Sequence, residues 1–248
     1  MVHLGPLPGA PNYGGDMAAL IEAAARDARI LVDAGFDALM VENFSDAPFF
    51  ADDVPPVTIA AMTRAVSAVL DAGGVPVGVN VLRNDALGAL AVAAATGASF
   101  IRVNVLSGSM MTDQGPVVGR AAEVARARRE LAPGVRVFAD VFVKHATPPY
   151  GLTLEQATSD LAHRGGADAV VVSGTATGAA PDAATVAAVR SAADGLPILV
   201  GSGVTSLTVG GFLAEADGVI VGTSLKVESV TTNPVDPGLA AAFVAAAN

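Results

Sequence analysis

The sequence predicts a (β/α)8 barrel, the TIM-barrel fold of the α/β class, on three observations. Short β-branched runs alternate strictly with Ala-rich segments in which apolar residues recur every three or four positions. Eight runs and eight segments fill 248 residues, which is the number of units and the length typical of this barrel. The runs are apolar throughout, as expected of parallel strands covered by helices. We therefore expect residues 1–248 to form a single barrel domain.

The predicted elements follow the chain in strict order. Strands are expected over residues 1–4, 37–43, 75–81, 99–105, 135–143, 167–174, 197–203 and 217–224. Helices are expected over residues 17–34, 57–72, 84–96, 117–132, 153–165, 182–194, 206–214 and 237–247. The first helix illustrates the criterion, because Leu20, Ala24, Asp27, Leu31 and Ala34 are spaced by three and four and so share one face.

Composition and charge exclude several classes of protein. The chain is 52% hydrophobic and 15% charged, which excludes disorder. Its formal charge is −10, and Lys144 and Lys226 are its two lysines, so nucleic acid and anionic membranes are disfavoured as partners. There is no cysteine to supply a disulfide, a thiolate or a cysteine–zinc site. The first residues do not resemble a signal peptide and no apolar run is long enough to span a membrane, so we expect a cytoplasmic protein.

The longest loops predict where function lies. The segments richest in proline and glycine are 5–15, 44–56, 106–116 and 144–152, and each follows a predicted strand. The loops that follow helices are short turns. In a (β/α)8 barrel the loops after the strands share one face, which carries the active site.

Side-chain alternation along the strands places polar residues inside the barrel. In the strand 135–143 the valines alternate with Phe138 and Asp140, and the β-branched set is expected to face the helices. The same reasoning turns the following polar residues inward: Glu42, Asn80, Arg102, Asn104, Asp140 and Lys144. Burying so many polar groups is costly unless they line a functional pocket or pair with one another. The alternative to a pocket is a hydrogen-bonded plug that pairs Arg102 with Glu42 or Asp140.

The scarcest residue types occur at the same strand ends. His3 ends the first strand, Lys144 and His145 follow the fifth, and Lys226 follows the eighth. With Glu42 and Asp140 they form the candidate catalytic set. A lone histidine at a strand end is more often structural, and His163, late in a helix, is expected at the surface.

Two glycine-rich strand ends, "LPILVGSGVTS" (196–206) and "ADGVIVGTSLK" (216–226), predict a phosphate site. They are the predicted seventh and eighth strands, where barrels of this kind commonly hold phosphate. Backbone N–H groups, hydroxyls and a helix expected to begin near Thr205 would all favour an anion. The candidate ligand-binding residues here are Gly201, Ser202, Gly203, Gly222, Thr223 and Ser224, with Ser173 beside them. The alternative is that the glycines only permit tight turns.

Other motifs are weak or absent. The chain has no P-loop, no GxGxxG after its first strand, no HExxH and no GxSxG. Glu42 with Asp140, and Asp46 in addition, could hold Mg²⁺ through carboxylate oxygens, but no recognised ligand spacing supports this, so any metal ligands stay undetermined.

Six segments together resemble the BtpA/SgcQ family: "MVHLGPLPGAP", "GFDALMVENFSDAPF", "VNVLSG", "DVFVKHA", "VIVGTSLK" and "NPVD". The resemblance runs through almost the whole chain and implies a barrel of the ribulose-phosphate-binding type. It also implies a link to photosystem I biogenesis for a photosynthetic member, sugar-uptake genes beside another, and a nucleosidase-like label without a firmly assigned activity. The family motifs fall on His3, Glu42, Asn43, Asp140, Lys144, His145, Gly222, Thr223, Ser224 and Lys226.

The start of the chain departs from this pattern. Family members usually carry residues ahead of the "MVHL" strand, whereas here Met1 begins within it. The resemblance therefore implies either a truncated N-terminus or a short first strand.

Two hypotheses of function follow. The first is an enzyme, lyase, hydrolase or nucleosidase-like, acting on a phosphorylated sugar or nucleoside-like ligand, with Asp140 or Glu42 as acid or base and Lys144 or Lys226 stabilising negative charge. Asn43, Asn80, Arg102 and Asn104 would help to bind the ligand. A Schiff base on Lys144 would require a depressed pKa, which a neighbouring Asp140 would oppose. The second hypothesis is a non-catalytic assembly factor that keeps the pocket. Apolar helices over 84–96 and 182–194 favour a homo-oligomer in either case.

Overall fold

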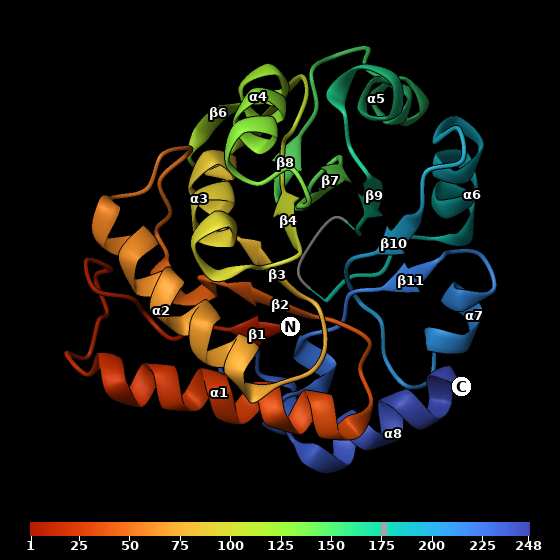
Figure 1. Cartoon of the computed structure of the whole chain (residues 1–248). Helices are drawn as coiled ribbons and strands as arrows, with labels where there is room; N and C mark the ends of the chain where they lie inside the picture. Colours follow the sequence, from red (N-terminus) through yellow and green to blue (C-terminus); the bar gives the residue numbers. More distant parts are fainter. Residues whose placement is uncertain (175–177) are drawn as a thin grey trace.

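The computed structural model describes residues 1–174 and 178–248, and its centre is a curled sheet of eight parallel strands (Figure 1). The hydrogen-bonded order is β1-β2-β3-β4-β7-β9-β10-β11. The strands are β1 (Val2–His3), β2 (Leu39–Glu42), β3 (Val77–Asn80), β4 (Phe100–Val103), β7 (Arg136–Val141), β9 (Ala169–Val172), β10 (Ile198–Val200) and β11 (Gly218–Val219). Each lies within a predicted run, so the predicted fold class is confirmed.

The two edge strands of the curled sheet approach each other. No ladder joins β11 to β1, but the N-terminal nitrogen of Met1 donates a hydrogen bond to the Val221 carbonyl over 2.9 Å. A side chain on Gly222 would also collide with the His3 ring. The first and last strands therefore lie side by side where their carboxyl ends open into the loops.

In the described part of the chain, eight α-helices surround the sheet in the predicted sequence order (Figure 1). They are α1 (Met17–Ala34), α2 (Pro56–Ala72), α3 (Ala86–Thr96), α4 (Ala121–Leu131), α5 (Leu154–Asp160), α6 (Ala183–Ala192), α7 (Val209–Leu213) and α8 (Pro237–Ala247). Local chemistry sets several of their starts. The Asp16, Asp85 and Asp236 side chains each accept a backbone N–H of the first turn that has no partner within the helix.

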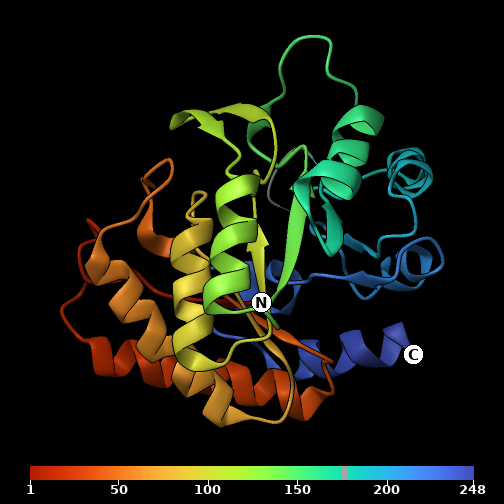
Figure 2. The same cartoon turned by 45° about the horizontal axis from the view of Figure 1, so that its top comes forward.

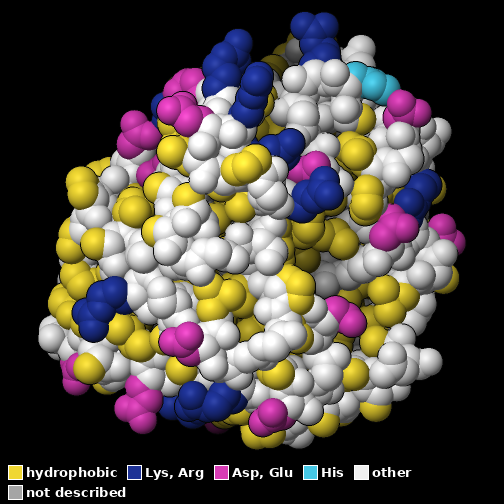
Figure 3. Space-filling view, viewed as in Figure 1, with side chains coloured by type: hydrophobic (Ala, Val, Ile, Leu, Met, Phe, Trp, Pro, Cys, Tyr) yellow, Lys and Arg dark blue, Asp and Glu magenta, His cyan; other side chains and the backbone are white. Residues whose placement is uncertain are grey.

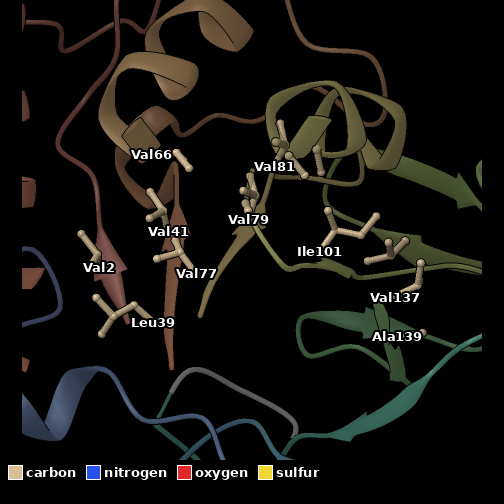
Figure 4. Packing of buried hydrophobic residues seen from close by; sticks show 14 of the residues in the cluster. Val2, Leu39, Val41, Val66, Val77, Val79, Val81, Ile101, Val137 and Ala139 are labelled. Atoms are coloured by element: carbon tan, nitrogen blue, oxygen red, sulfur yellow. The ribbon is translucent and has the colours of Figure 1, made fainter. Parts of the chain in front are cut away.

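The two faces of the barrel strands carry different kinds of side chain. The β-branched side chains turn outward and pack against the helices, as Figure 4 shows for Val41 and Val77 beside Val66 of α2. The opposite face carries Phe100 and Phe138, whose rings stack 4.7 Å apart inside the barrel. Asn80 and Asn104 meet on that same face with a 2.9 Å hydrogen bond. The alternation predicted from the sequence is confirmed.

A second, three-stranded sheet lies mostly in segments that the sequence predicted to be loops, and it also takes residues 117–118 from the predicted helix 117–132, which begins instead at Ala121. It is antiparallel, in the order β6-β5-β8, with β5 (Ser109–Thr112), β6 (Gly115–Val118) and β8 (Ala146–Thr147). Met110 and Val117 are paired in register and pack on Val105 and Val143. Figure 2 shows β5 and β6 projecting above the barrel strands. Local patterning missed this sheet because each strand is short and β8 pairs with residues far away in sequence.

Two further expectations need correction. The helix expected near Thr205 begins at Val209 and has only five residues, because 206–208 form a turn. The segments 84–96 and 182–194 expose no large apolar side chain: Leu90, Val92, Val186 and Val189 are buried in the core. Their apolar character therefore reflects packing inside this chain, and the homo-oligomer stays a prediction without that support. Within the described residues, no helix is long and apolar enough to cross a membrane.

Candidate functional site

A cavity of about 230 Å³ opens where the carboxyl ends of the strands meet. Its walls come from β1, β2 and β4, from the segment after β7, and from the loops after β10 and β11. The predicted site residues among its lining are His3, Glu42, Arg102, Lys144, Gly201, Ser202, Gly203, Gly222, Thr223 and Ser224. Residues separated by more than 200 positions in the chain are thus brought into one chamber.

The loop after β11 presents backbone donors to this cavity. A single 3₁₀ turn, Thr223–Leu225, follows Gly222, and the turn has no side-chain cap. The backbone N–H groups of Gly222, Thr223 and Ser224 have no acceptor in the part of the chain that the structure describes. N–H groups at the first positions of a helical turn have no partner within it. Together they form a concavity suited to an anion.

The loop after β10 adds to this concavity. The N–H groups of Ser202 and Gly203 likewise have no acceptor among the described residues. The Ser224 hydroxyl joins the two loops by donating to the Val204 carbonyl over 2.8 Å. The Thr223 hydroxyl lies 2.8 Å from that of Thr231, which also lines the cavity. These side-chain contacts hold the two loops, and the residues of both loops line the same cavity.

A buried ion pair closes the inner end of the cavity. Nε and Nη2 of Arg102 donate to the two carboxylate oxygens of Asp140, each over 2.9 Å. Both side chains are almost inaccessible, at 3% and 0%. Asn80 donates to Asn104 and to the Arg102 carbonyl, which ties the pair to β3 and β4. These four residues therefore form the hydrogen-bonded cluster that the sequence suggested as the alternative to a pocket. Arg102 nevertheless also lines the cavity.

Lys144 lines the same cavity as the glycine-rich loops. No hydrogen bond or ion pair to another described residue involves its ammonium group. Burial lowers the pKa of Lys144, and the charges of Arg102 and Arg83 lower it further, against the opposing effect of Glu42 and Asp140. Its backbone is fixed by Arg83, whose Nη2 donates to the Lys144 carbonyl over 2.7 Å. The cavity thus contains a lysine whose amine is paired by none of the described residues.

His3 and Glu42 complete the wall nearest β1. Burial lowers the pKa of His3 well below its ordinary value, and the N-terminal ammonium, Lys226, Lys144 and Arg102 lower it further. The imidazole is therefore neutral at pH 7, and the 4.0 Å between its Nε2 and Glu42 is not an ion pair there. Nδ1 of His3 is buried without a hydrogen-bond partner. The pair presents a neutral base and a carboxylate to the same space.

Comparison with known proteins gives this geometry a family. A model described as the BtpA family matches residues 1–248. The chain belongs to the BtpA family. The Photosystem I biogenesis protein BtpA of Synechocystis sp. is 45% identical over 99% of this chain and 86% of its own length. A protein of Thermococcus kodakarensis is 48% identical over 95% of this chain and 88% of its own length.

Solved structures support the barrel of this BtpA-family chain. A tryptophan synthase chain from M. tuberculosis superposes with a TM-score of 0.61 at 22% identity, covering 92% of this chain and 87% of its own. Phosphoribosyl anthranilate isomerase from Thermus thermophilus gives 0.55 at 14% identity, covering 90% and 92%. At these identities the likeness concerns the barrel fold alone.

The glycines of the BtpA-family site have structural roles as well. A Cβ on Gly203, which has a φ of +69°, would lie 2.2 Å from the backbone nitrogen of Ala180. A Cβ on Gly222 would lie 2.6 Å from Cε1 of His3. Both positions therefore need glycine for close packing. This close packing, which the sequence did not indicate, means that substitutions at these glycines would not isolate anion binding.

Several predicted site residues do not line the cavity. Lys226 is buried and its ammonium donates to Asp27 of α1 over 2.8 Å. Asn43 pairs with the backbone of Leu82, which fixes the segment after β3. Ser173 lies behind Gly201, and its buried hydroxyl has no partner among the described residues. His145 is exposed on the segment that follows Lys144, where burial and the charges of Lys144 and Arg83 lower its pKa.

The acidic residues suggested for Mg²⁺ do not gather. No group of three His, Cys, Asp or Glu side chains able to hold a metal exists in residues 1–174 and 178–248. Asp140 is paired with Arg102, and Asp46 accepts from Asn43 and from the Leu7 backbone. The described residues therefore do not form the Mg²⁺ site that these carboxylates suggested.

Sequence reasoning missed some residues that shape the site. Arg83 and Phe44 lie in loops after β3 and β2, where strand alternation no longer predicts direction, and Thr231 belongs to the segment beyond the last strand. Arg83 is almost fully buried, and the available signal for it was an arginine close behind an apolar strand. The surface charge is also uneven. Figure 3 shows Lys and Arg side chains gathered near α4, which carries Arg126, Arg128 and Arg129.

We expect His3 to make the protein sensitive to acid. In the unfolded chain, His3 takes up a proton near pH 6.5, whereas in the folded protein its pKa lies well below that value. Protonation therefore favours the unfolded state, and the free energy of unfolding falls as the pH drops below 6.5. The slope for one such group is at most about 1.4 kcal/mol per pH unit. Urea unfolding at pH 7 and pH 5.5 should show a larger loss for the wild type than for His3→Gln. Equal losses would mean that His3 titrates alike in both states.

Proposed function

We propose that this BtpA-family chain is an enzyme that binds a phosphorylated small molecule, a sugar or a nucleoside-like compound, at the carboxyl end of its barrel. The observation that carries the proposal is the set of unpartnered backbone N–H groups at Gly222, Thr223 and Ser224, which borders the same cavity as the unpaired Lys144. Backbone donors and a local cation favour a dianion even in a chain whose net charge is −10.

The remaining residues of the cavity have distinct parts in this proposal. The two glycine-rich loops hold the phosphate. Glu42 is the acid or base, because Asp140, the other carboxylate considered, is committed to Arg102. Lys144 and the remaining Nη1 of Arg102 stabilise negative charge that develops on the substrate. Lys226 takes no direct part, since its ammonium pairs with Asp27 outside the cavity.

A second candidate function is that of an assembly factor. The Synechocystis relative, which is 45% identical and is named a photosystem I biogenesis protein, supports it. The same pocket would then serve as a regulatory or vestigial ligand site. Glu42→Gln separates the two candidates: an enzyme loses turnover with this variant, whereas an assembly factor keeps its cellular function.

The phosphate site is tested with ribose 5-phosphate, using ribose as the probe without phosphate. We expect ribose 5-phosphate to raise the melting temperature and ribose to leave it unchanged. At 100 times its Kd a ligand adds about 2.7 kcal/mol to stability. Thr223→Pro removes one free N–H at the first position of a helical turn, where proline is tolerated, whereas Thr223→Val removes the hydroxyl and keeps that N–H.

The two Thr223 variants should therefore differ. We expect Thr223→Pro to weaken binding about tenfold or more relative to Thr223→Val, since a hydrogen bond to a charged group is worth about 1.5–3 kcal/mol. Lys144→Met should also weaken binding, and the exposed Arg129→Met is its control with the same change of net charge. Unfolding without ligand shows whether each variant is folded. If ribose 5-phosphate binds Thr223→Pro and Lys144→Met as it binds the wild type, the proposed site is wrong.

A further inference from the structure

The two lysines of the chain differ in whether a carboxylate pairs with their amine. The amine of Lys226 is 1% exposed and donates a hydrogen bond to the Asp27 carboxylate. Lys144 borders the cavity and has no such partner within the described residues. Partial removal from water without a counter-ion lowers the pKa of Lys144, so a larger fraction of its amine is in the neutral, nucleophilic form than in an exposed lysine.

The structure also removes the objection that the sequence raised. Asp140 was expected to keep Lys144 charged, but both of its carboxylate oxygens accept from Arg102, which carries a compensating charge. Burial lowers the pKa of Lys144 and outweighs the opposing charges of Glu42 and Asp140. Asp140 thus sits in a neutral pair beneath the cavity and does not pair with the Lys144 amine.

The backbone around Lys144 is unusual in the same place. Phe142 and His145 have φ values of 49° and 57°, in the left-handed region that side chains rarely adopt. The Arg83 guanidinium holds this segment by its bond to the Lys144 carbonyl. Strained residues of this kind cost about 1–3 kcal/mol each and cluster at functional sites. Here these two residues lie on either side of Lys144, whose amine has no partner among the described residues.

We propose that Lys144 is a nucleophile that forms a Schiff base with a phosphorylated aldehyde or ketone. This inference rests on the proposed phosphate site, and it narrows the ligand to one with a carbonyl carbon within reach of the Lys144 amine. The phosphate would lie in the loops of β10 and β11, and the carbonyl would point toward Lys144 and Glu42.

The covalent step balances with the groups present. Glu42, which lines the same cavity, takes one proton from the Lys144 ammonium. The free amine adds to the carbonyl carbon, and a proton passes from nitrogen to the new oxyanion. Glu42 then returns its proton to the hydroxyl, which leaves as water while the nitrogen lone pair forms the C=N bond. The net change is ammonium plus carbonyl to iminium plus water, with no oxidation or reduction.

The experiment uses pyridoxal 5′-phosphate, a phosphorylated aldehyde, as the probe, and borohydride to reduce and so trap the imine. Because the chain has only two lysines, intact mass and peptide mapping assign the adduct directly. We expect one adduct on Lys144, retained in Lys226→Arg and lost in Lys144→Arg. The labelling rate should rise with pH through a midpoint below that of an ordinary exposed lysine. Pyridoxal without phosphate should label at least tenfold more slowly, and inorganic phosphate should protect.

The outcomes separate this inference from the phosphate site. If ribose 5-phosphate stabilises the protein but no adduct forms on Lys144, the Schiff base is wrong and the phosphate site stands. If Lys144 is labelled equally by pyridoxal, without protection by phosphate, the phosphorylated class of substrate is overturned. An adduct confined to the N-terminal amine or to Lys226 overturns the assignment to Lys144.

Discussion

Asp140→Leu is expected to lower the free energy of unfolding by about 3–5 kcal/mol, because it leaves Arg102 charged and unpaired inside the barrel. Two hydrogen bonds of 2.9 Å are lost at once, and neither side chain can reach bulk water in their place. The Asn104 amide also loses its acceptor on Asp140. Urea unfolding at pH 7 measures the effect.

The double variant Arg102→Met with Asp140→Leu is the control for this prediction. Replacing both partners removes the uncompensated charge, so most of the lost stability should return. Because the two residues interact directly, their separate effects should not add. If Asp140→Leu unfolded at the same urea concentration as the wild type, the Arg102–Asp140 ion pair would not contribute to stability as proposed.

Asp27→Leu should lower the free energy of unfolding by a similar amount, about 3–5 kcal/mol, because it leaves the buried Lys226 without its partner. Lys226 is 1% exposed and donates to Asp27 over 2.8 Å. Asp27 also accepts the backbone N–H of Val235, so it joins α1 to the segment that leads into α8. The change therefore removes two links between residues about 200 positions apart.

Asp27→Leu combined with Lys226→Met tests this explanation and the role of Lys226 together. We expect the double variant to recover stability relative to Asp27→Leu and to bind ribose 5-phosphate as the wild type does, since neither residue borders the proposed phosphate site. Lys226 belongs to the catalytic set expected from the sequence, whereas its place in the structure is that of a buried structural cation. If a well-folded double variant lost ligand binding, Lys226 would belong to the functional site after all.

The sequence alone was sufficient for the barrel and for the inward face of its strands. Eight alternating patterns with periods of about two and three to four residues predicted eight strands and eight helices. The same alternation turned Glu42, Asn80, Asn104 and Asp140 inward, and it identified "GSG" and "GTS" as neighbouring strand ends. These features are local, because the side-chain direction within a strand follows from the backbone pleat.

What each polar residue does could be decided only by the tertiary structure. Arg102 and Asp140 are 38 positions apart, and Lys226 and Asp27 are 199 apart, so no local pattern indicates which cation meets which carboxylate. The sheet of β5, β6 and β8, the anchoring of Lys144 by Arg83 and the second role of Gly203 depend on the same long-range contacts. Chain direction and periodicity determine which side of a strand a residue faces. Partner choice, and with it the difference between a paired and an unpaired lysine, depends on how the folded chain brings distant segments together and excludes water.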